Sequence, residues 1–188
     1  EQKGKIILIN GASSAGKSTL ARAVQGQFPL PLLHLSFDLF IDGDILPMAQ
    51  IRAGTFSWPV LRPAVFEGYY RCWPALAGAG NHLLIDHIVE SKKDLQTMIK
   101  LLMGIDVFFV ALHCSAAELE RRERKRGDRR KGEAHADFRT VHAFTTYDLE
   151  LDSEQNSVPE NAAQLINAWQ QRRSPSAFAR MTAETAVD

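Results

Sequence analysis

The stretch that decides the fold reads Gly11-Ala12-Ser13-Ser14-Ala15-Gly16-Lys17-Ser18. It matches the pattern G-x-x-x-x-G-K-[ST] in full, and in a chain of 188 residues a chance match occurs about once in a hundred sequences. The apolar residues 5–10 come directly before it and are typical of a buried strand. Residues 17–25 follow with apolar side chains at helical spacing, so the motif joins a strand to a helix.

This motif predicts a loop that binds phosphate groups. Its glycines allow a tight turn with inward-pointing N–H groups, and the N-terminus of the next helix adds partial positive charge. We expect Lys17 to reach the β- and γ-phosphates of a nucleotide and the Ser18 hydroxyl to bind Mg²⁺. The alternative is a glycine-rich turn that only connects strand to helix. The predicted nucleotide-binding residues are Gly11, Ala12, Ser13, Ser14, Ala15, Gly16, Lys17, Ser18 and Thr19.

Strand-like and helix-like segments alternate along the rest of the chain. Further strands are predicted over residues 30–37, 83–86, 105–114 and 149–151, and further helices over 61–79, 94–103, 116–127 and 158–171. Pro63 and Pro74 predict a break or a kink in the helix that contains them. The alternation favours an α/β fold with a parallel sheet and helices on both faces. We expect one domain over residues 1–171 and a mobile tail over residues 172–188, which lack a clear apolar period.

Two carboxylates follow predicted strands: Asp38 comes after residues 30–37, and Asp86 ends residues 83–86. Ligands of open α/β sheets gather outside the carboxyl ends of the strands. Asp86 suits Mg²⁺ or its water shell, and Asp38 is then available to accept a proton from an attacking hydroxyl. The alternative for each is a helix cap or a solvated loop residue. For His87 and Trp58 two interpretations stay open, since either residue could line the same pocket or serve only loop structure and packing.

Residues 118–133 carry eight basic side chains against five acidic ones. In the first half, Glu118–Arg122 and Glu120–Arg124 predict i,i+4 pairs on a solvated helix face. In the second half, Gly127 interrupts the helix between Arg126 and Arg129, which indicates a hinged lid that brings guanidinium groups onto a phosphoryl group. Nucleic-acid binding is a third interpretation, disfavoured because no aromatic residues are interleaved.

Composition narrows the class of protein. The chain has 22 Lys and Arg against 22 Asp and Glu, which argues against a main role in binding nucleic acid or an anionic membrane. Two cysteines exclude a disulfide scaffold and make a reducing cytoplasm the default. The apolar runs fall short of the roughly 20 residues that span a bilayer, and no secretory signal is visible, so we expect a cytoplasmic protein without a membrane partner.

The assembled pattern resembles the chloramphenicol phosphotransferase-like family of P-loop kinases. The resemblance covers residues 5 to about 169 and rests on the segment from Ile6 to Ser18, the strand-end Asp38, Leu84-Ile85-Asp86, Arg126-Gly127-Asp128-Arg129, and the segment from Tyr147 to Ser153. It implies a three-layer P-loop NTPase fold, with a five-stranded parallel sheet, helices on both faces and a short arginine-rich lid. It also implies ATP with Mg²⁺, and O-phosphorylation of a small hydroxylated acceptor. His87 stands where the family has a second acid, and residues 39–63 show little similarity, which leaves the acceptor open.

We therefore expect an ATP-dependent O-phosphotransferase that acts on a small molecule such as an antibiotic. Asp38 is the expected base, and Lys17, Arg126 and Arg129 are expected to stabilise charge on the phosphoryl oxygens, with Ser18 and Asp86 at Mg²⁺. The alternatives are a kinase like the zeta toxins or another small-metabolite kinase, a nucleotide-binding switch protein without an acceptor, and a nucleic-acid-binding module. The choice between ATP and GTP and the oligomeric state stay open.

Overall fold

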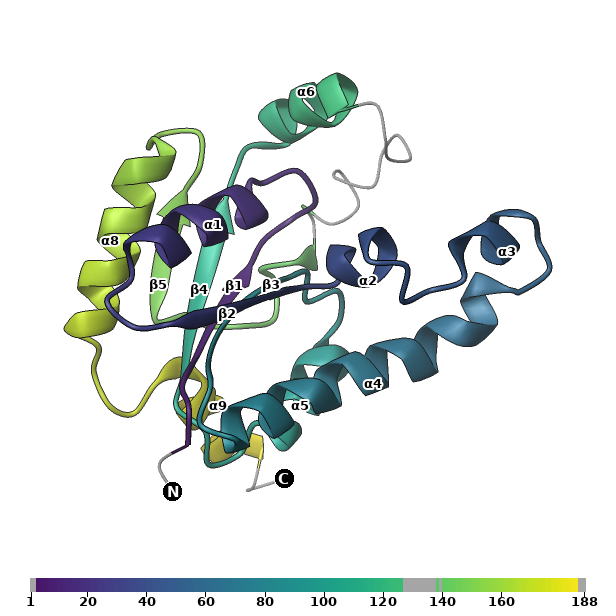
Figure 1. Ribbon diagram of the computed structural model, residues 1–188. Coiled ribbons are helices and arrows are strands. Elements are labelled where there is room, and N and C mark those ends of the chain that lie inside the picture. The colour runs from purple at the N-terminus through teal and green to yellow at the C-terminus, as the bar shows by residue number, and fades with distance from the viewer. Residues whose placement is uncertain (1–2, 127–137, 139, 186–188) are drawn as a thin grey trace.

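The computed structural model describes residues 3–126, 138 and 140–185. Within these ranges, five parallel strands form a single sheet in the order β2-β3-β1-β4-β5 (Figure 1). The strands are β1 (Ile6–Asn10), β2 (Leu32–Ser36), β3 (His82–His87), β4 (Val107–His113) and β5 (Leu149–Asp152). The helices are α1 (Lys17–Gln27), α2 (Asp38–Asp42), α3 (Met48–Arg52), α4 (Trp58–Gly78), α5 (Lys92–Leu101), α6 (Ala116–Arg126), α8 (Val158–Gln170) and α9 (Ala177–Thr185). The predicted parallel sheet is confirmed.

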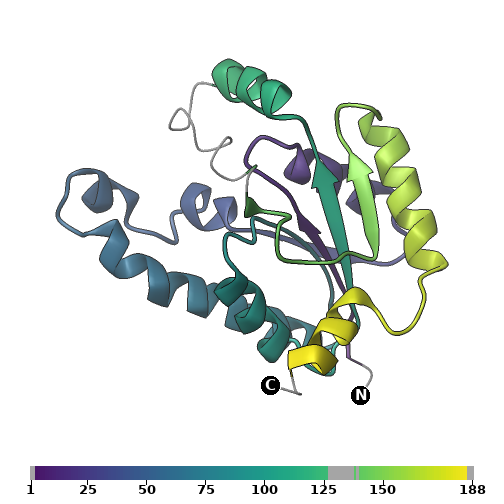
Figure 2. The same ribbon diagram turned by 180° about the vertical axis from the view of Figure 1, so that it is seen from behind.

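The sheet is buried on both faces because helices cover each of them. In β1 the pleat sends Ile7 and Ile9 toward the core beneath α1 and α8, and Ile6 and Leu8 toward the core beneath α4, α5 and α9. Every residue of β1 is fully buried, which explains why Ile6 to Ile9 form a continuous apolar run ahead of the polar Asn10. The two layers of helices are visible on opposite sides of the sheet in Figures 1 and 2.

Helix α4 continues through both of its prolines, so the predicted break does not occur. A proline inside a helix costs about 3 kcal/mol, because it removes a hydrogen bond and crowds the preceding turn. The C-terminal half of α4 buries Tyr69, Tyr70 and Trp73 against the sheet, and each large buried side chain contributes about 1.5–3 kcal/mol. Packing thus outweighs the prolines. Figure 1 shows that the N-terminal end of α4 and α3 extend beyond the sheet.

The C-terminal segment contains a helix where the sequence predicted none. Residues 177–185 form α9, which packs beside α5 and over β4. Ala177, Phe178 and Met181 are buried there, and the Phe178 ring meets Phe109 edge to face at 5.1 Å between ring centres. Three apolar residues in one turn and a half are too short a pattern to stand out as a period, yet they suffice to close the sheet face.

The carboxyl ends of β1, β2 and β3 meet at one edge of the sheet. The register pairs Asn10 with His87 and Ser36 with Asp86, so the loop after β1, the segment after β2 and the end of β3 lie together. Asn10 fixes this corner: its amide donates to the Val141 carbonyl at 2.9 Å, and its side-chain oxygen accepts from the Val89 N–H at 2.9 Å. Among the described residues, no helix is both long and apolar enough to cross a bilayer.

Candidate active site

The loop after β1 adopts a compact turn that requires glycine at two places. A Cβ on Gly11 would stand 2.6 Å from the Leu112 carbonyl oxygen, and Gly16 has φ 95°, in the left-handed region. Ser14 also lies in that region, with φ 64°. The Lys17 ammonium is buried and donates to the Ala12 carbonyl at 2.8 Å, so the cation is held at the loop itself.

A cavity of about 750 Å³ opens beside this loop at the carboxyl edge of the sheet. It brings together most of the predicted site residues, namely Ser13, Ser14, Gly16, Lys17, Ser18, Thr19, Asp38 and Asp86. Gly11, Ala12 and Ala15 belong to the turn but do not line the cavity. Segments from three regions of the sequence therefore converge on one space, as expected for ligands at the carboxyl ends of parallel strands.

Asp86 is a buried carboxylate held in its ionised form. Its Oδ2 lies 2.6 Å from His34 Nε2, and the pair is nearly inaccessible to solvent. Burial by itself raises the pKa of Asp86, but the hydrogen bond from His34 and the positive charge of Lys17 outweigh burial, so this pKa lies below its ordinary value. An ionised carboxylate therefore lines the same cavity as the loop after β1.

The residues present fit a nucleotide with Mg²⁺. The Ser14 hydroxyl oxygen is buried and makes no hydrogen bond within the described part of the chain, which leaves an unsatisfied polar group in the loop. No group of three or more His, Cys, Asp and Glu side chains gathers as a metal cage among the described residues. Mg²⁺ does not need one, since it commonly binds through one or two protein oxygens, phosphates and water. Ser18 and Asp86 both line the cavity and supply such oxygens.

Asp38 lines the same cavity as the loop. It begins α2 directly after β2, and its backbone N–H donates to the Ser36 hydroxyl at 3.4 Å. Asp38 and Asp42, four residues apart, share one face of this short helix, and both line the cavity. The residue predicted to act as base thus shares one cavity with the loop residues.

The predicted lid arginines are only partly described. Arg126 is the last residue of α6, its side chain lies outside the described residues, and Arg129 does too. The earlier part of the helix forms the expected pairs: Arg122 Nε lies 2.7 Å from Glu118 Oε1, and Arg124 Nη1 lies 3.9 Å from Glu120 Oε2. Arg122 does more than predicted, because Nη1 donates to the Ala15 carbonyl at 3.2 Å and Nη2 to the Ser153 carbonyl at 2.8 Å.

Several cavity residues were not found from the sequence. His34 is the clearest: it stands two residues before Ser36 on β2, so both lie on the same face of the strand, and β2 pairs with β3. The alternation of side chains along β2 places His34 and Ser36 on one face of the strand. Only the pairing of β2 with β3 shows that this face meets Asp86. Arg62 and Glu90 also line the cavity and bind each other, with Arg62 Nη2 at 2.6 Å and 2.7 Å from the two oxygens of Glu90.

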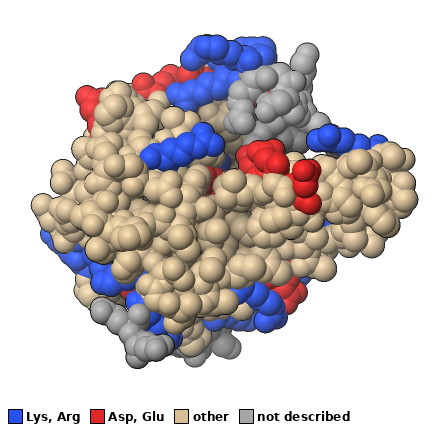
Figure 3. Space-filling model, in the orientation of Figure 1, with Lys and Arg blue, Asp and Glu red and all other residues tan. Residues whose placement is uncertain are grey.

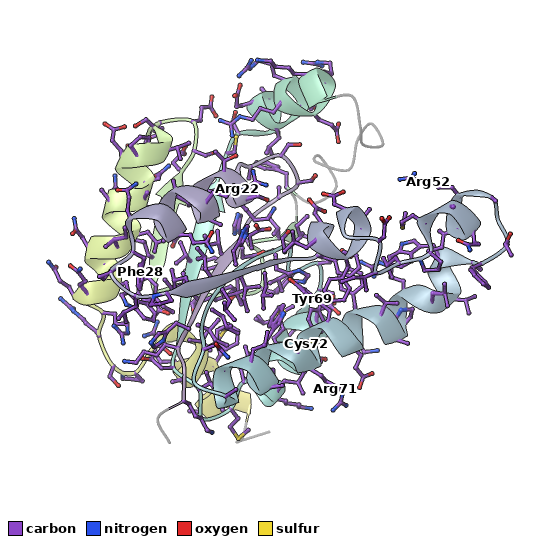
Figure 4. The ribbon with its side chains drawn as sticks, in the orientation of Figure 1. Arg22, Phe28, Arg52, Tyr69, Arg71 and Cys72 are labelled. Carbon is purple, nitrogen blue, oxygen red and sulfur yellow. The ribbon has the colours of Figure 1, made fainter. Side chains whose placement is uncertain are left out.

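Trp58 and His87 both line the cavity, as one of the two interpretations of each predicts. His87 is buried, its Nε2 lies 3.0 Å from the Tyr70 hydroxyl, and burial lowers its pKa to about 3, so the ring is neutral. The Tyr69 side chain lies between α4 and the sheet, whereas Arg71 and Cys72 on the same helix point away from the sheet (Figure 4). The inner face of α4 thereby supplies an aromatic layer behind the cavity.

Comparison with known proteins agrees with this geometry. A sequence model of the family described as "Chloramphenicol phosphotransferase-like protein" matches residues 4–170. Two Mycobacterium tuberculosis proteins (strains CDC 1551 / Oshkosh and ATCC 25618 / H37Rv), each named "Putative O-phosphotransferase", are 32% identical over 199 residues, which is 95% of this chain and 88% of theirs.

Solved structures share the fold. The Mycobacterium tuberculosis APS kinase CysC, in complex with AMPPNP and APS, superposes with a TM-score of 0.69 at 21% identity, over 90% of this chain and 99% of that one. The Deinococcus radiodurans tunicamycin resistance protein gives a TM-score of 0.61 at 16% identity, over 91% and 98%.

Proposed function

The chain belongs to the chloramphenicol phosphotransferase-like family and is a kinase, and from this premise we propose that it transfers the γ-phosphoryl group of ATP to a hydroxyl of a small molecule. One observation carries the proposal: a single cavity joins the phosphate loop and Lys17 to the carboxylate of Asp38. An acceptor hydroxyl beside Asp38 would face the terminal phosphate of a nucleotide held by the loop. That is the arrangement phosphoryl transfer requires, because positioning and electrostatics supply most of the rate acceleration.

In the proposed reaction Asp38 orients the acceptor hydroxyl and takes its proton. The hydroxyl oxygen bonds to the γ-phosphorus while the bond from that phosphorus to the bridging oxygen breaks, and ADP leaves. Lys17 and the loop N–H groups stabilise negative charge on the phosphoryl oxygens. Mg²⁺, when bound at Ser18 and Asp86, would supply further charge neutralisation. We assign Arg126 and Arg129 to the same task from the sequence pattern.

His34 holds the Asp86 carboxylate through the 2.6 Å contact and so orients a proposed metal ligand. A partner that positions a ligand in this way is commonly needed for full metal affinity. Arg122 holds the back of the phosphate loop through the Ala15 carbonyl. These two side chains are positioning residues in the proposed site.

The test is acceptor-dependent transfer from labelled ATP by the parent chain and by Asp38→Asn. We expect Asp38→Asn to retain nucleotide binding and to lose about 10²- to 10⁴-fold of the transfer rate, since it keeps the shape of the side chain but removes the base. Asp44→Asn is the matched control, because Asp44 is exposed and lies outside the cavity lining.

Equal transfer rates in the parent and Asp38→Asn would remove the base assignment. Slow hydrolysis of nucleotide that no acceptor accelerates would favour a nucleotide-binding switch protein. Mass spectrometry of the product identifies the acceptor and the oxygen that carries the phosphate.

A further inference from the structure

Asn10 is a polar residue at the end of the apolar strand β1, and it has no exposed surface. Asparagine is disfavoured in strands, and a buried amide without hydrogen bonds lowers stability, so this side chain needs partners. Its Oδ1 accepts from the Val89 N–H at 2.9 Å. Its Nδ2 donates to the Val141 carbonyl at 2.9 Å and to the Tyr147 hydroxyl at 2.8 Å, which uses both amide hydrogens.

These bonds tie the phosphate loop to two segments that lie far from it in the sequence. Gly11, the first residue of the loop, follows Asn10 directly. The main-chain pairing of β1 with β3 ends at Asn10 and His87, and the Asn10 side chain extends the connection to Val89. The amide nitrogen holds the Val141 carbonyl at the same time. The start of the loop is therefore fixed to both segments by one side chain.

The two main-chain partners determine how the amide is oriented, because the Val89 N–H can only donate and the Val141 carbonyl can only accept. Nδ2 therefore donates to the Tyr147 hydroxyl, whose own hydrogen is left for another acceptor. His142 Nδ1 lies 2.7 Å from that hydroxyl oxygen, whereas the Val141 carbonyl oxygen lies 3.4 Å away. The shorter contact favours donation to His142, so the ring hydrogen is on Nε2. Burial agrees with a neutral ring, since it lowers the pKa of His142 to about 4.

The side chains of this network do not face a ligand in the cavity. Asn10, Tyr147 and His142 are absent from its lining. On the face shown in Figure 3, acidic side chains are exposed over α2 and a basic one over α1, whereas Asn10 is wholly buried. An effect of the network on a bound nucleotide must therefore pass through the main chain of the loop.

On the basis of the nucleotide binding in the proposed function, we propose that Asn10 is a positioning residue for the phosphate loop. Its two main-chain bonds hold Gly11 and the residues after it in the conformation that receives phosphate. Through Tyr147, the same amide fixes His142 in the form that carries its hydrogen on Nε2. The apparent affinity for nucleotide then depends on the population of the ordered loop, and loss of the Asn10 amide lowers that population.

Calorimetric titration with AMPPNP and Mg²⁺ separates positioning of the loop from stability of the fold. Asn10→Ala removes both main-chain bonds and should raise the Kd for AMPPNP on the order of tenfold at unchanged stoichiometry. A merely structural role would lower the stoichiometry, because part of the protein unfolds, and would leave Kd unchanged. Asn81→Ala is the matched control, since Asn81 donates to the Leu76 carbonyl at 3.1 Å just before β3, at the opposite edge of the sheet. It should change neither quantity.

Nitrogen NMR of histidine-labelled protein tests the direction of the hydrogen bonds. The signals of His142 are assigned by their loss in His142→Gln. We expect Nε2 to carry the hydrogen and Nδ1 to be an acceptor in the parent chain. Tyr147→Phe keeps the ring that packs on Phe109 but removes the donor, and should shift the Nδ1 signal. A hydrogen on Nδ1 in the parent, or no shift in Tyr147→Phe, would contradict the assigned direction.

The titration also separates this inference from the function on which it rests. If the parent does not bind AMPPNP, the proposed function and the inference are both wrong. If the parent binds AMPPNP and Asn10→Ala binds it with the same Kd, the inference alone is wrong. If Asn10→Ala does not fold, Asn10→Ser takes its place, because one hydroxyl can replace at most one of the two main-chain bonds and the same rise in Kd is expected.

Discussion

Asp86 and His87 are consecutive buried residues at the end of β3. In the fold the Asp86 side chain is charged and the His87 side chain is neutral. Burial opposes charge on each of them. Asp86 stays charged because His34 and Lys17 compensate, whereas His87 faces the Tyr70 hydroxyl and stays neutral. The pleat of the strand sends the two side chains to different faces, which gives them different hydrogen-bond partners.

The state of His87 predicts a pH dependence of stability. Its pKa falls from the ordinary 6.5 to about 3 in the fold, so between these values the unfolded chain takes up a proton that the folded chain does not. Stability is therefore lost as the pH falls, by about 2 kcal/mol at pH 5 relative to pH 8. In His87→Gln, which keeps a partner for Tyr70, this part of the loss should vanish in urea unfolding at the two pH values.

His142, whose pKa is lowered to about 4 by burial and by His113, adds a loss in the same direction that both chains share. Asp86 contributes only near and below its ordinary value of 3.8, where its carboxylate takes up a proton. If the free energy of unfolding fell equally between pH 8 and pH 5 in the parent and in His87→Gln, His87 would be protonated in the folded chain at pH 5.

At the scale of elements, α6 is attached to the phosphate loop by one of two adjacent arginines. Both arginines pair with Glu118, but Arg122 also bonds to Ala15 and Ser153, whereas the exposed Arg121 pairs only with Glu118 among the described residues. We expect Arg122→Ala to lower the free energy of unfolding by about 1–3 kcal/mol, because two part-buried carbonyls lose this donor. Arg121→Ala should leave that free energy unchanged, since exposed ion pairs contribute little.

Chemical denaturation of both variants measures the difference. Nucleotide affinity of Arg122→Ala, measured separately, should fall as the loop loses its support. Equal stability of the two variants would mean that the loop does not depend on α6.

Helix α9 gives a second prediction at this scale. Phe178→Ala removes a ring that is 4% exposed and packed on Phe109, so a loss of about 3–5 kcal/mol is expected. Arg180→Ala on the exposed side of α9 serves as the control. A thermal melt in which the two variants coincide would indicate that α9 does not form part of the folded core.

At the scale of the whole molecule, we expect nucleotide bound in the cavity to raise the free energy of unfolding. A ligand that binds only the folded chain adds about 2.7 kcal/mol to the free energy of unfolding at a hundred times its Kd. We expect a non-hydrolysable ATP analogue to do so with the parent chain, and to lose most of the effect in Lys17→Ala. Lys93→Ala, on the exposed face of α5, is the control.

The quantity to compare is the change in the free energy of unfolding that the analogue causes in each chain. The absolute free energies are not compared, because Lys17 is buried and its replacement can change stability by itself. An undiminished shift in Lys17→Ala would contradict the assignment of residues 11–18 as a phosphate loop.

The sequence by itself determined the parallel sheet, the phosphate loop, and Asp38 and Asp86 at the strand ends. Those features are local: strands and helices differ in apolar period, and the loop is eight consecutive residues whose spacing reflects backbone geometry. The i,i+4 ion pairs of α6 could also be predicted from the sequence, because residues four apart are neighbours on any α-helix.

Only the tertiary structure decided that His34 holds Asp86, that Arg122 supports the loop, that α4 continues through its prolines, and that residues 177–185 close the sheet. It also decided the aromatic contacts that join Phe37 to Trp58 and Phe66 across two elements. Each of these depends on which strands pair and which faces pack. Contacts between residues far apart in the chain leave no pattern in the local sequence. Their contribution to stability depends on how the strands pair and which faces pack, so it could not be predicted from neighbouring residues.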